Sequence, residues 1–329
     1  MGNFEPIVNI IIVTWNAVDY TKACIESIRK YTSYPYLLTV VDNGSTDGTL
    51  EYLRSEHEVN LIANKENLGY GQAIVQGYEF RPTPLICVMN NDVVVSPGWL
   101  ESLVSIAKKD PEIGILGPLR PAGFCLHPYS GRSTHVVLKE TRGREIPPPE
   151  EWLRRFCAPY TYEAFVREVK RRNNFGIRFL EGPPGAISTC CALINSKIAE
   201  KVGGLADPQF YKYGCEDIDL CWRIFRGGFK MAITSEAYVH HFKHVSADIN
   251  ELDRKSLTEE NMRRFFEKWE GVIRDFLTKE LQEGRDIKAL LKSEEWDWWF
   301  MIELSRVIDP EKFWRGVEKS MLNKEREWQ

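Results

Sequence analysis

The sequence predicts an α/β fold: a mostly parallel sheet flanked by helices, followed by a helical appendage. Two observations from the first 120 residues support this: short runs rich in β-branched residues, and helical patterns that alternate with them. Such alternation is typical of a parallel sheet covered by helices on both faces. A third observation is that an all-helical, highly charged pattern begins at about residue 250.

The first ninety residues contain four apolar runs that predict strands. These are residues 8–13, 37–41, 59–63 and 85–89. Helical spacing of apolar residues predicts helices over 19–30, 50–55 and 69–80, and another that starts near Pro97. Ser45, Thr46 or Asp47 can cap the second of these helices, with Asp47 the preferred cap.

Residues 121–182 interrupt the alternation. Three prolines at 147–149 break regular structure, the surrounding sequence is rich in Arg and Lys, and residues 150–172 have helical character. A solvated helical excursion and a basic clamp for a substrate both explain this composition. Strand and helix patterns then return, with an apolar run within 185–195, a helix over 216–226 and short strands at 230–233 and 237–239.

We expect residues 1–249 to form one domain and residues 250–329 a helical appendage to it. The tryptophans of the appendage are Trp269, Trp296, Trp298, Trp299, Trp314 and Trp328. A Trp-rich amphipathic region can contact a membrane surface. Its mixed charge instead favours packing on the main domain or on another subunit, so an oligomer formed through these helices is one expectation.

Composition excludes several classes of protein. The net charge of −4 gives no bulk attraction to nucleic acid. No apolar stretch approaches about 18 residues and no basic-flanked apolar leader begins the chain, so we expect a cytoplasmic protein with at most peripheral contact at the inner face of a membrane. The eight cysteines form no CxxC pair, which favours buried, reduced thiols.

Polar residues gather where the predicted strands end. Thr14 and Asn16 follow the first strand, Asp42 the second, and Asp92 the fourth. In an open α/β sheet, ligands bind at the carboxyl ends of the strands. A lone acid between two apolar runs is costly to bury without compensation, and a carboxylate beside amide oxygens suits a divalent cation that also holds a diphosphate. A polar turn between two strands is the alternative for Asp92.

Taken together and in this order, these stretches resemble the family-2 glycosyltransferases with the Rossmann-like GT-A fold. The matching sequences include VVDNGSTDGTLEYL, NKENLGYGQAIVQGY, VMNNDVVVSPGWLESL and EKVGGLADPQFYKYGCEDIDLCWRIFRGGFKMAI. The resemblance covers roughly residues 7–120 and 183–245. It implies metal-dependent transfer of a sugar from a nucleotide sugar to an acceptor hydroxyl, with inversion, and it places residues 121–182 on the acceptor side.

For the donor, the resemblance implies that Thr14 and Asn16 lie near the base and that Asp42 accepts the N3–H of uracil or thymine. A UDP- or dTDP-linked hexose is therefore expected, rather than a GDP sugar. Asn67 and Gly69 are expected beside the donor, where Gly69 lets the backbone pass close to it. For Asp42 a turn cap is the simpler alternative, and for Gly69 it is loop geometry.

For the metal, the resemblance implies that Asp92 binds Mn²⁺ or Mg²⁺ and that Asn91 contacts the metal shell or the donor ribose. The family usually shows DXD here, whereas Asn90 and Asn91 replace the leading acids. One carboxylate predicts weak metal affinity in the absence of donor. His241 is the candidate second ligand, ahead of His240, although a structural role stays open for both. A nearby cation, Lys243, is a candidate to pair with the diphosphate.

For catalysis, Glu216-Asp217 matches the family's ED motif. The resemblance implies that one of them is the general base, and we predict Asp217, with Glu216 as the alternative. A helix N-terminus lowers a carboxyl pKa, whereas burial and a second acid raise it. Both acids could instead only stabilise the helix start. Asp219 and Arg223, four residues apart, predict an ion pair within the helix.

Two other functions compete with this interpretation. A dinucleotide-dependent oxidoreductase would need a glycine fingerprint after the first strand, and residues 14–18 contain no glycine. A non-catalytic nucleotide-sugar-binding protein on the same fold is conceivable because the leading aspartates are missing. The acceptor stays open among a carbohydrate, a lipid-linked saccharide and a protein.

Overall fold

The computed structural model describes residues 8–183, 185–293 and 296–317. Its strands are β1 Val8–Thr14, β2 Tyr36–Asp42, β3 Asn60–Ala63, β4 Leu85–Asn90, β5 Val93–Val95, β6 Ile113–Leu119, β7 Ile177–Leu180, β8 Cys191–Asn195 and β9 Lys230–His241. Its helices are α1 Val18–Tyr31, α2 Thr49–Ser55, α3 Tyr70–Phe80, α4 Trp99–Lys109, α5 Thr134–Arg142, α6 Pro149–Cys157, α7 Tyr162–Arg172, α8 Ser196–Lys201, α9 Glu216–Arg226, α10 Val245–Ile249, α11 Arg254–Gln282, α12 Ile287–Leu290, α13 Trp299–Val307 and α14 Pro310–Trp314, with a 3₁₀ turn at Trp296–Trp298.

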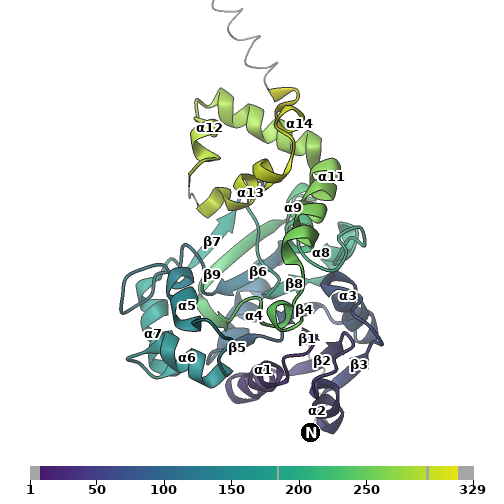
Figure 1. Ribbon diagram of the computed structural model, residues 1–329, viewed down its shortest axis with the longest axis vertical. Helices are drawn as coiled ribbons and strands as arrows, with labels where there is room; N and C mark the ends of the chain where they lie inside the picture. The colour runs from purple at the N-terminus through teal and green to yellow at the C-terminus, as the bar shows by residue number, and fades with distance from the viewer. Residues whose placement is uncertain (1–7, 184, 294–295, 318–329) are drawn as a thin grey trace, which may run out of the picture.

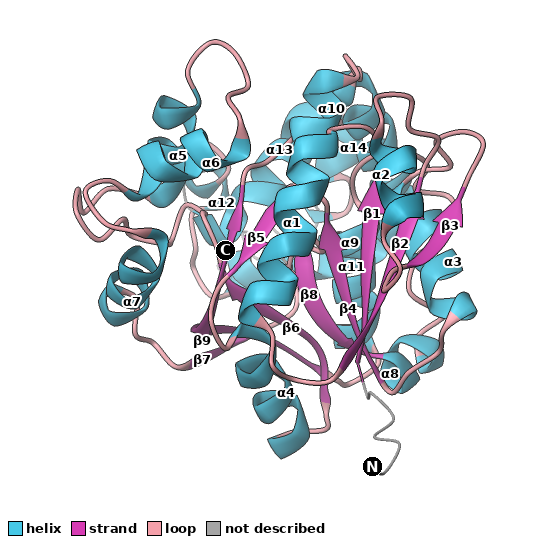
Figure 2. Ribbon diagram, turned by 90° about the horizontal axis from the view of Figure 1, so that it is seen from below, coloured by secondary structure: helices cyan, strands magenta, loops and turns pink. Residues whose placement is uncertain are grey.

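The strands form one sheet in the order β3-β2-β1-β4-β8-β6-β9-β5, with β7 also paired to β9 (Figure 2). Strands β3, β2, β1 and β4 are mutually parallel, as the strand–helix alternation predicts. Beyond β4 the sheet is mixed, because β8 runs antiparallel to both β4 and β6 while β6 and β9 are parallel. The parallel half brings the ends of β1, β2 and β4 to one edge, where the polar residues follow them.

Two short strands were predicted at 230–233 and 237–239, and this prediction was wrong. The residues form the single strand β9, which continues through the polar residues between the two apolar runs. Thr234 and Ser235 hydroxyls bond to the backbone of Gly176, so the polar segment keeps its partners within the sheet. A register irregularity against β6 lies at the same point.

The excursion at residues 121–182 has a packed core of its own. Its helical run is divided into α6 and α7, because Pro159 cannot continue a helix. Trp152 and Phe156 of α6 are buried with Phe242 of the main domain, and the Trp152 and Phe242 ring centroids are 5.1 Å apart. The excursion is therefore anchored on the sheet and is more than a solvated helical insertion; it lies at the end of the sheet away from β3 (Figure 2).

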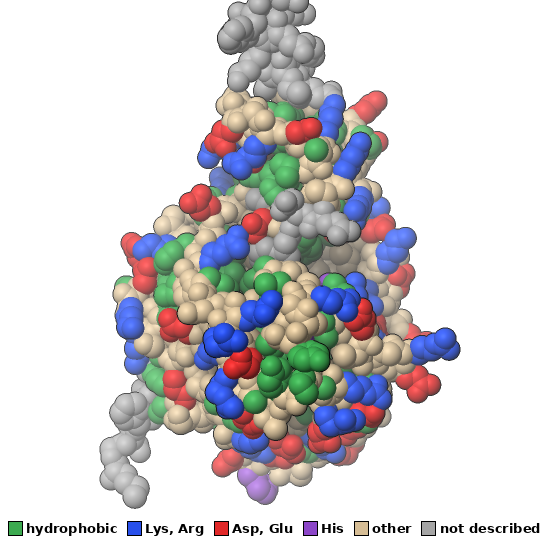
Figure 3. Space-filling view, turned by 90° about the vertical axis from the view of Figure 1, so that its left-hand side faces the viewer, with side chains coloured by type: hydrophobic (Ala, Val, Ile, Leu, Met, Phe, Trp, Pro, Cys, Tyr) green, Lys and Arg blue, Asp and Glu red, His purple; other side chains and the backbone are tan. Residues whose placement is uncertain are grey.

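The surface carries charges of both signs. Figure 3 shows Lys and Arg side chains interspersed with Asp and Glu over one face of the molecule, together with patches of hydrophobic side chains. This mixture agrees with the small net charge. Among the described residues, no helix is both long and apolar enough to cross a membrane. All eight cysteines are buried and free, which confirms the prediction of buried thiols.

The C-terminal helices share a hydrophobic core with the sheet. Helix α11 rises from the main domain (Figure 1), and its first half packs against α9. Trp222 of α9 contacts Phe265 and Trp269 of α11, with ring centroids 4.8 and 5.5 Å apart. Packing of the Trp-rich region on the main domain is therefore confirmed for Trp269. Trp328 lies outside the described residues.

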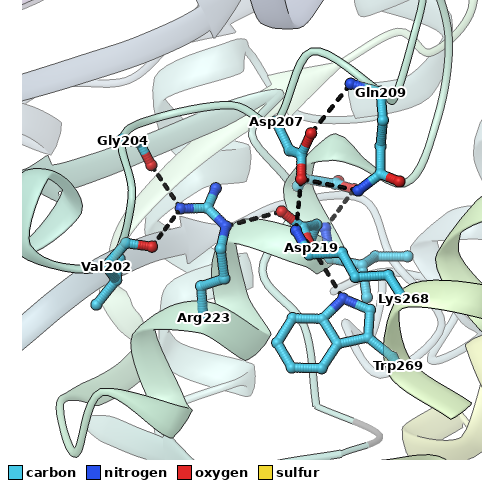
Figure 4. Close-up of polar contacts among 10 residues, drawn as sticks. Val202, Gly204, Asp207, Gln209, Asp219, Arg223, Lys268 and Trp269 are labelled. Atoms are coloured by element: carbon cyan, nitrogen blue, oxygen red, sulfur yellow. Dashed lines mark hydrogen bonds and ion pairs between the residues drawn. The ribbon is translucent and has the colours of Figure 1, made fainter.

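A buried polar network fixes α9 to α11 (Figure 4). Asp219 is fully buried, and its carboxylate accepts from Arg223 Nε at 2.8 Å, which confirms the ion pair within the helix. The same carboxylate also bonds Trp269 Nε1 at 2.9 Å and Lys268 Nζ at 2.6 Å from α11. Arg223 in turn donates to the carbonyls of Val202 and Gly204. Contacts from α11 and from the segment that follows α8 therefore hold the first turns of α9 in place.

We expect Asp219→Asn to lower the free energy of unfolding by about 3 kcal/mol, because removing one partner of a buried ion pair leaves uncompensated charge. Urea denaturation measures this loss. Asp297→Asn is the matched control: Asp297 pairs with Arg178, and both side chains are about half exposed. Its loss should stay within about 1 kcal/mol. Equal losses in the two variants would contradict the role given to Asp219.

Candidate functional site

A cavity of about 1040 Å³ opens at the carboxyl ends of β1 and β4. Asp92 and His241 line one wall, and Glu216 and Asp217 at the start of α9 line another. Helices α11 and α13 complete the cavity with residues that include Arg254, Lys255, Thr258, Met262, Trp299, Phe300, Glu303 and Arg306. Residues from four distant parts of the chain, β1, β4, α9 and the C-terminal helices, therefore meet around one space.

Asn91 connects the ends of β1 and β4 to their neighbours at the cavity. Its amide nitrogen donates to the hydroxyls of Thr14 and Thr21 and to the carbonyl of Asn16, at 3.0–3.2 Å. Its oxygen accepts from the Ser246 hydroxyl at 3.0 Å. A carboxylate could not donate to the Asn16 carbonyl, so the network suits asparagine. Thr14 and Asn91 are buried, and these bonds join the ends of β1 and β4 to α1 and α10.

Asp92 and His241 form a buried pair. Asp92 Oδ1 lies 3.1 Å from His241 Nε2, and Asp92 Oδ2 accepts from the backbone N–H of Val245 at 3.3 Å. Burial would raise the pKa of Asp92, but the imidazole of His241 outweighs it and holds this pKa below its usual value. Burial would lower the pKa of His241, yet Cys190 and Asp92 raise it to about 9.

The neighbouring histidines His240 and His244 have different surroundings. His240 is fully buried between the rings of Phe156 and Phe242, each with its centroid 4.6 Å away, and burial lowers the pKa of His240 to about 3. His244 lines the cavity but bonds the Tyr213 hydroxyl through Nδ1 at 2.8 Å. Only His241 of the three combines access to the cavity with contact to Asp92.

The expected nucleotide residues divide into two groups. Asn67 lines the cavity together with Trp15, which is half-buried there. Asp42 and Asn16 do not line it. The Asn16 side-chain nitrogen donates to Asn250 Oδ1, and the Asn16 side-chain oxygen accepts the N–H of Thr46. Asn16 therefore ties the loop after β1 to α10 and to the loop after β2.

Asp42 is fully buried at the end of β2, and one of its two carboxylate oxygens accepts a hydrogen bond. Oδ2 accepts the N–H of Ser45 at 3.1 Å, so the carboxylate does cap a turn. Oδ1 has no hydrogen bond within the described residues, and burial raises the pKa of Asp42. The preferred cap, Asp47, accepts from the N–H of Thr49 at the start of α2, as predicted, and also from that of Val18 at the start of α1.

Gly69 permits a close backbone approach, but to another part of the chain. Its φ is +90°, and a Cβ there would lie 2.8 Å from the backbone nitrogen of Lys212. Asn67 Oδ1 accepts the N–H of Gly69 at 2.8 Å and so fixes the turn that begins α3. The glycine thus brings the loop after β3 against the loop before α9, between the nucleotide side and the acid pair.

The acid pair sits at the N-terminus of α9. Burial is the main cause that raises the pKa of both acids, and for Glu216 the charge of Asp217 adds to it. Asp217 Oδ1 accepts the N–H of Ile218, which opposes this rise. Burial therefore outweighs the helix terminus, and a carboxyl with a raised pKa is the better proton acceptor.

Asn261 of α11 was not anticipated as a support of the site. Its buried amide donates to the carbonyls of Tyr211, Tyr213 and Gly214, at 2.9–3.0 Å. These residues form the loop that leads into the acid pair. The available signal in the sequence was a polar residue on the apolar stripe of a helix, one turn before Phe265.

Comparison with known proteins identifies the family. The model of glycosyl transferase family 2 matches residues 9–203, more than half of the chain. The chain belongs to this family. It is 28% identical over 249 residues to N-acetylglucosaminyl-diphospho-decaprenol L-rhamnosyltransferase of Mycobacterium tuberculosis, a match that covers 71% of this chain and 76% of the relative. It is 25% identical over 240 residues to validoxylamine A glucosyltransferase of Streptomyces hygroscopicus subsp. limoneus, covering 71% of this chain and 51% of the relative.

The family assignment agrees with the fold. A mannosyltransferase of Pyrobaculum calidifontis, solved with GDP-Man and Mn²⁺, aligns with a TM-score of 0.52 at 15% identity, covering 83% of this chain and 65% of that one. The chain has the GT-A fold and is a glycosyltransferase, so the non-catalytic alternative is set aside. Among its curated relatives, the chain spans between 18% and 76% of their length.

Proposed function

We propose that this family-2 glycosyltransferase transfers a hexose from a UDP- or dTDP-sugar to an acceptor hydroxyl by a single displacement with inversion. The observation that carries the proposal is the arrangement of two acidic centres around one cavity: Asp92 with His241 on one wall, and Glu216 with Asp217 on another. A single displacement needs one base on the acceptor side and charge stabilisation on the leaving-group side.

The donor preference rests on Asp42. A buried carboxylate oxygen without a hydrogen-bond partner is costly, and Asp42 Oδ1 has no such partner within the described residues. It lies at the edge of the sheet where nucleotides bind in α/β folds. Uracil and thymine each offer a ring N–H to such an oxygen. Asn43, the next residue, lines the cavity. The Asp42 carboxylate is therefore adjacent to the part of the cavity where we propose that the nucleotide binds.

The residues at Asp92 fit a divalent cation. Asp92 Oδ1 makes no hydrogen bond within the described residues, although it is ion-paired with His241 Nε2. Carboxylate oxygen and imidazole nitrogen both coordinate Mn²⁺, and a diphosphate supplies further oxygens. When bound, the cation would stabilise the negative charge of the departing nucleoside diphosphate. Asp92 and His241 would hold it, and the Val245 N–H orients the carboxylate.

The proton of the acceptor hydroxyl goes to Asp217 in this proposal. The acid pair is half-buried at the cavity wall, and the Asn261 bonds fix the loop before it. The acceptor oxygen would attack the anomeric carbon as its proton passes to the Asp217 carboxylate, while the bond to the diphosphate oxygen breaks. Burial raises the pKa of Asp217, and the charge of Asp217 adds to the rise in the pKa of Glu216.

A thermal-shift screen tests the donor class. We expect UDP or dTDP with Mn²⁺ to raise the melting temperature more than GDP does, because a ligand that binds only the native state stabilises it. Asp42→Asn should weaken UDP binding about tenfold, since a hydrogen bond to a charged group is lost. Asp47→Asn, in the same loop, is the control and should leave the affinity unchanged. A preference for GDP would contradict the role of Asp42.

The pH dependence tests the base. A base must be deprotonated, so kcat/KM should rise with pH as the acid pair loses its proton. Because burial raises both pKa values, the rise should be centred clearly above pH 4, the ordinary range of an aspartic acid. Initial rates across a pH series measure this limb. A rate that is flat from about pH 4 upward would contradict a base with a raised pKa.

The acceptor is proposed more broadly. One relative is named for N-acetylglucosaminyl-diphospho-decaprenol and another for validoxylamine A. The cavity extends from the acid pair to Trp299 and Arg306 of α13, so the C-terminal helices would form one side of the acceptor space. A carbohydrate or lipid-linked saccharide is the proposed class.

A further inference from the structure

Helices α11 and α13 each turn one face toward the cavity that holds the acid pair. The lining residues include Trp299, Glu303 and Arg306 on α13, and Thr258 and Met262 on α11. Their spacings of three or four residues place each set on one side of its helix. Both faces combine an apolar side chain with hydroxyl or charged groups, a combination that is typical of small-molecule sites.

The wall that α11 forms continues from the acid pair to α13. Thr258 lies close to Gly214, because a Cβ added to this glycine would be 3.5 Å from Thr258 Oγ1. Gly214 is two residues before Glu216. Further along α11, Phe265 packs on Phe300 of α13, with ring centroids 4.9 Å apart. A ligand that extends from the acid pair along this wall therefore meets α13.

The three consecutive aromatic residues at 298–300 differ in their surroundings. Trp298 is buried, with its ring centroid 5.3 Å from that of Phe276, and Phe300 is fully buried. These two side chains anchor the start of α13, whereas Trp299 is 43% exposed. Trp299 also lines a second cavity of about 280 Å³, together with Phe179 of β7. A single exposed aromatic side chain is ordinary on a protein surface, but this one borders two cavities.

Glu303 and Arg306 supply polar groups on the same face as Trp299. They form an ion pair with each other, and the side chains are 47% and 62% exposed. An ion pair this exposed contributes little to stability, so a ligand can compete for both groups. The carboxylate can accept from hydroxyl groups, and the guanidinium can donate to hydroxyl and ring oxygens.

We propose that Trp299, Glu303 and Arg306 form a subsite for a pyranose ring of the acceptor, with the Trp299 indole as the surface on which the ring stacks. The inference rests on the proposed function, in which Asp217 takes the proton of the acceptor hydroxyl. A pyranose ring presents C–H groups on its faces, which pack against an aromatic ring, and hydroxyls at its rim, which bond to charged side chains. The donor hexose presents the same chemistry.

NMR of the indole N–H groups tests the subsite in the full chain with UDP and Mg²⁺ present. The signals missing from Trp299→Phe and from Trp15→Phe identify the two tryptophans that line the large cavity. At concentrations from about 1 mM upward, methyl β-glycosides of glucose, galactose or N-acetylglucosamine should shift the Trp299 signal saturably and leave that of Trp15 unchanged. Sorbitol, an acyclic polyol, should shift neither signal. A Trp299 signal that no glycoside moves, or that sorbitol moves equally, would overturn the proposal.

Variants of Trp299 test the stacking directly. Trp299→Ala should weaken glycoside binding about tenfold in saturation-transfer NMR, and Trp299→Tyr should recover part of the affinity because it restores a ring. Tyr129→Ala is the matched control, since this aromatic side chain is 70% exposed and lines neither of the two cavities. Its glycoside affinity should equal that of wild type. Equal affinities in wild type and Trp299→Ala would contradict the subsite.

A titration with UDP-glucose and Mg²⁺ separates the acceptor from the donor hexose. UDP-glucose should shift the Trp15 signal and leave Trp299 able to respond to the glycosides. If UDP-glucose instead moves the Trp299 signal and blocks the glycosides, Trp299 belongs to the donor sugar and the acceptor subsite is overturned. If no nucleotide binds while the glycosides still move the Trp299 signal, the proposed function and the acceptor assignment fail together, whereas the saccharide site itself stands.

Discussion

Asp217→Asn should reduce the rate of sugar transfer by about 10²- to 10⁴-fold, the range that a positioned general base contributes. Asparagine keeps the size of the side chain and its acceptor for the Ile218 N–H, so the start of α9 should remain intact. Donor binding, measured as a thermal shift with UDP and Mn²⁺, should equal that of wild type. Loss of transfer with retained binding identifies a group that acts only in the chemical step.

Glu216→Gln is the matched comparison for Asp217→Asn. Glu216 lies beside Asp217 on the same turn, and in our proposal it takes no proton from the acceptor. Its removal should cost less than about tenfold in rate. The acid limb of the pH profile should stay in place, because burial is what raises the pKa of Asp217. Normal transfer by Asp217→Asn together with an inactive Glu216→Gln would exchange the two roles.

Asp92→Asn should also strongly reduce the rate of transfer, but through a different step. A metal supplies several kcal/mol of stabilisation to the leaving group, so a loss of about 10²-fold or more is expected. The Mn²⁺-dependent part of the UDP thermal shift should disappear, whereas the shift with uridine alone should remain. The isosteric amide can still accept the Val245 N–H, which limits damage to the fold.

Two variants serve as controls for Asp92→Asn. His241→Gln removes the imidazole but leaves the carboxylate, so it should weaken Mn²⁺ dependence less than Asp92→Asn does. His240→Gln alters the neighbouring histidine, which is packed among aromatic rings away from the metal candidates, and should lower stability rather than metal response. A UDP shift in Asp92→Asn that still depends fully on Mn²⁺ would show that the metal is held elsewhere.

The sequence allowed the parallel half of the fold to be predicted because its signals are local. The runs at β1, β2 and β4 are short, apolar and followed by turn residues, and α9 begins at the acid pair and ends before Gly227. The mixed half of the sheet was harder to predict. Strand β9 contains a polar segment whose partners come from Gly176, more than fifty residues away, so local pattern divided one strand into two.

The site shows the same limit. The sequence points to Asp92 through its position at a strand end and through the family resemblance, and to the acid pair through the resemblance. Asn261 and the Lys268–Asp219 contact were not, because each connects α11 to residues about fifty positions earlier. Contacts of this kind follow from tertiary packing, which periodicity does not record.

A crystal structure with UDP and Mn²⁺, in which the anomalous signal of manganese locates the ion, most directly tests the claim that Asp92 and Asp217 face each other across one cavity. We expect the manganese peak within coordination distance of an Asp92 oxygen and of diphosphate oxygens, with the Asp217 carboxylate facing the sugar side of the same cavity. A peak bound to other residues, or an Asp217 side chain turned away from the sugar end of the bound nucleotide, would contradict the account.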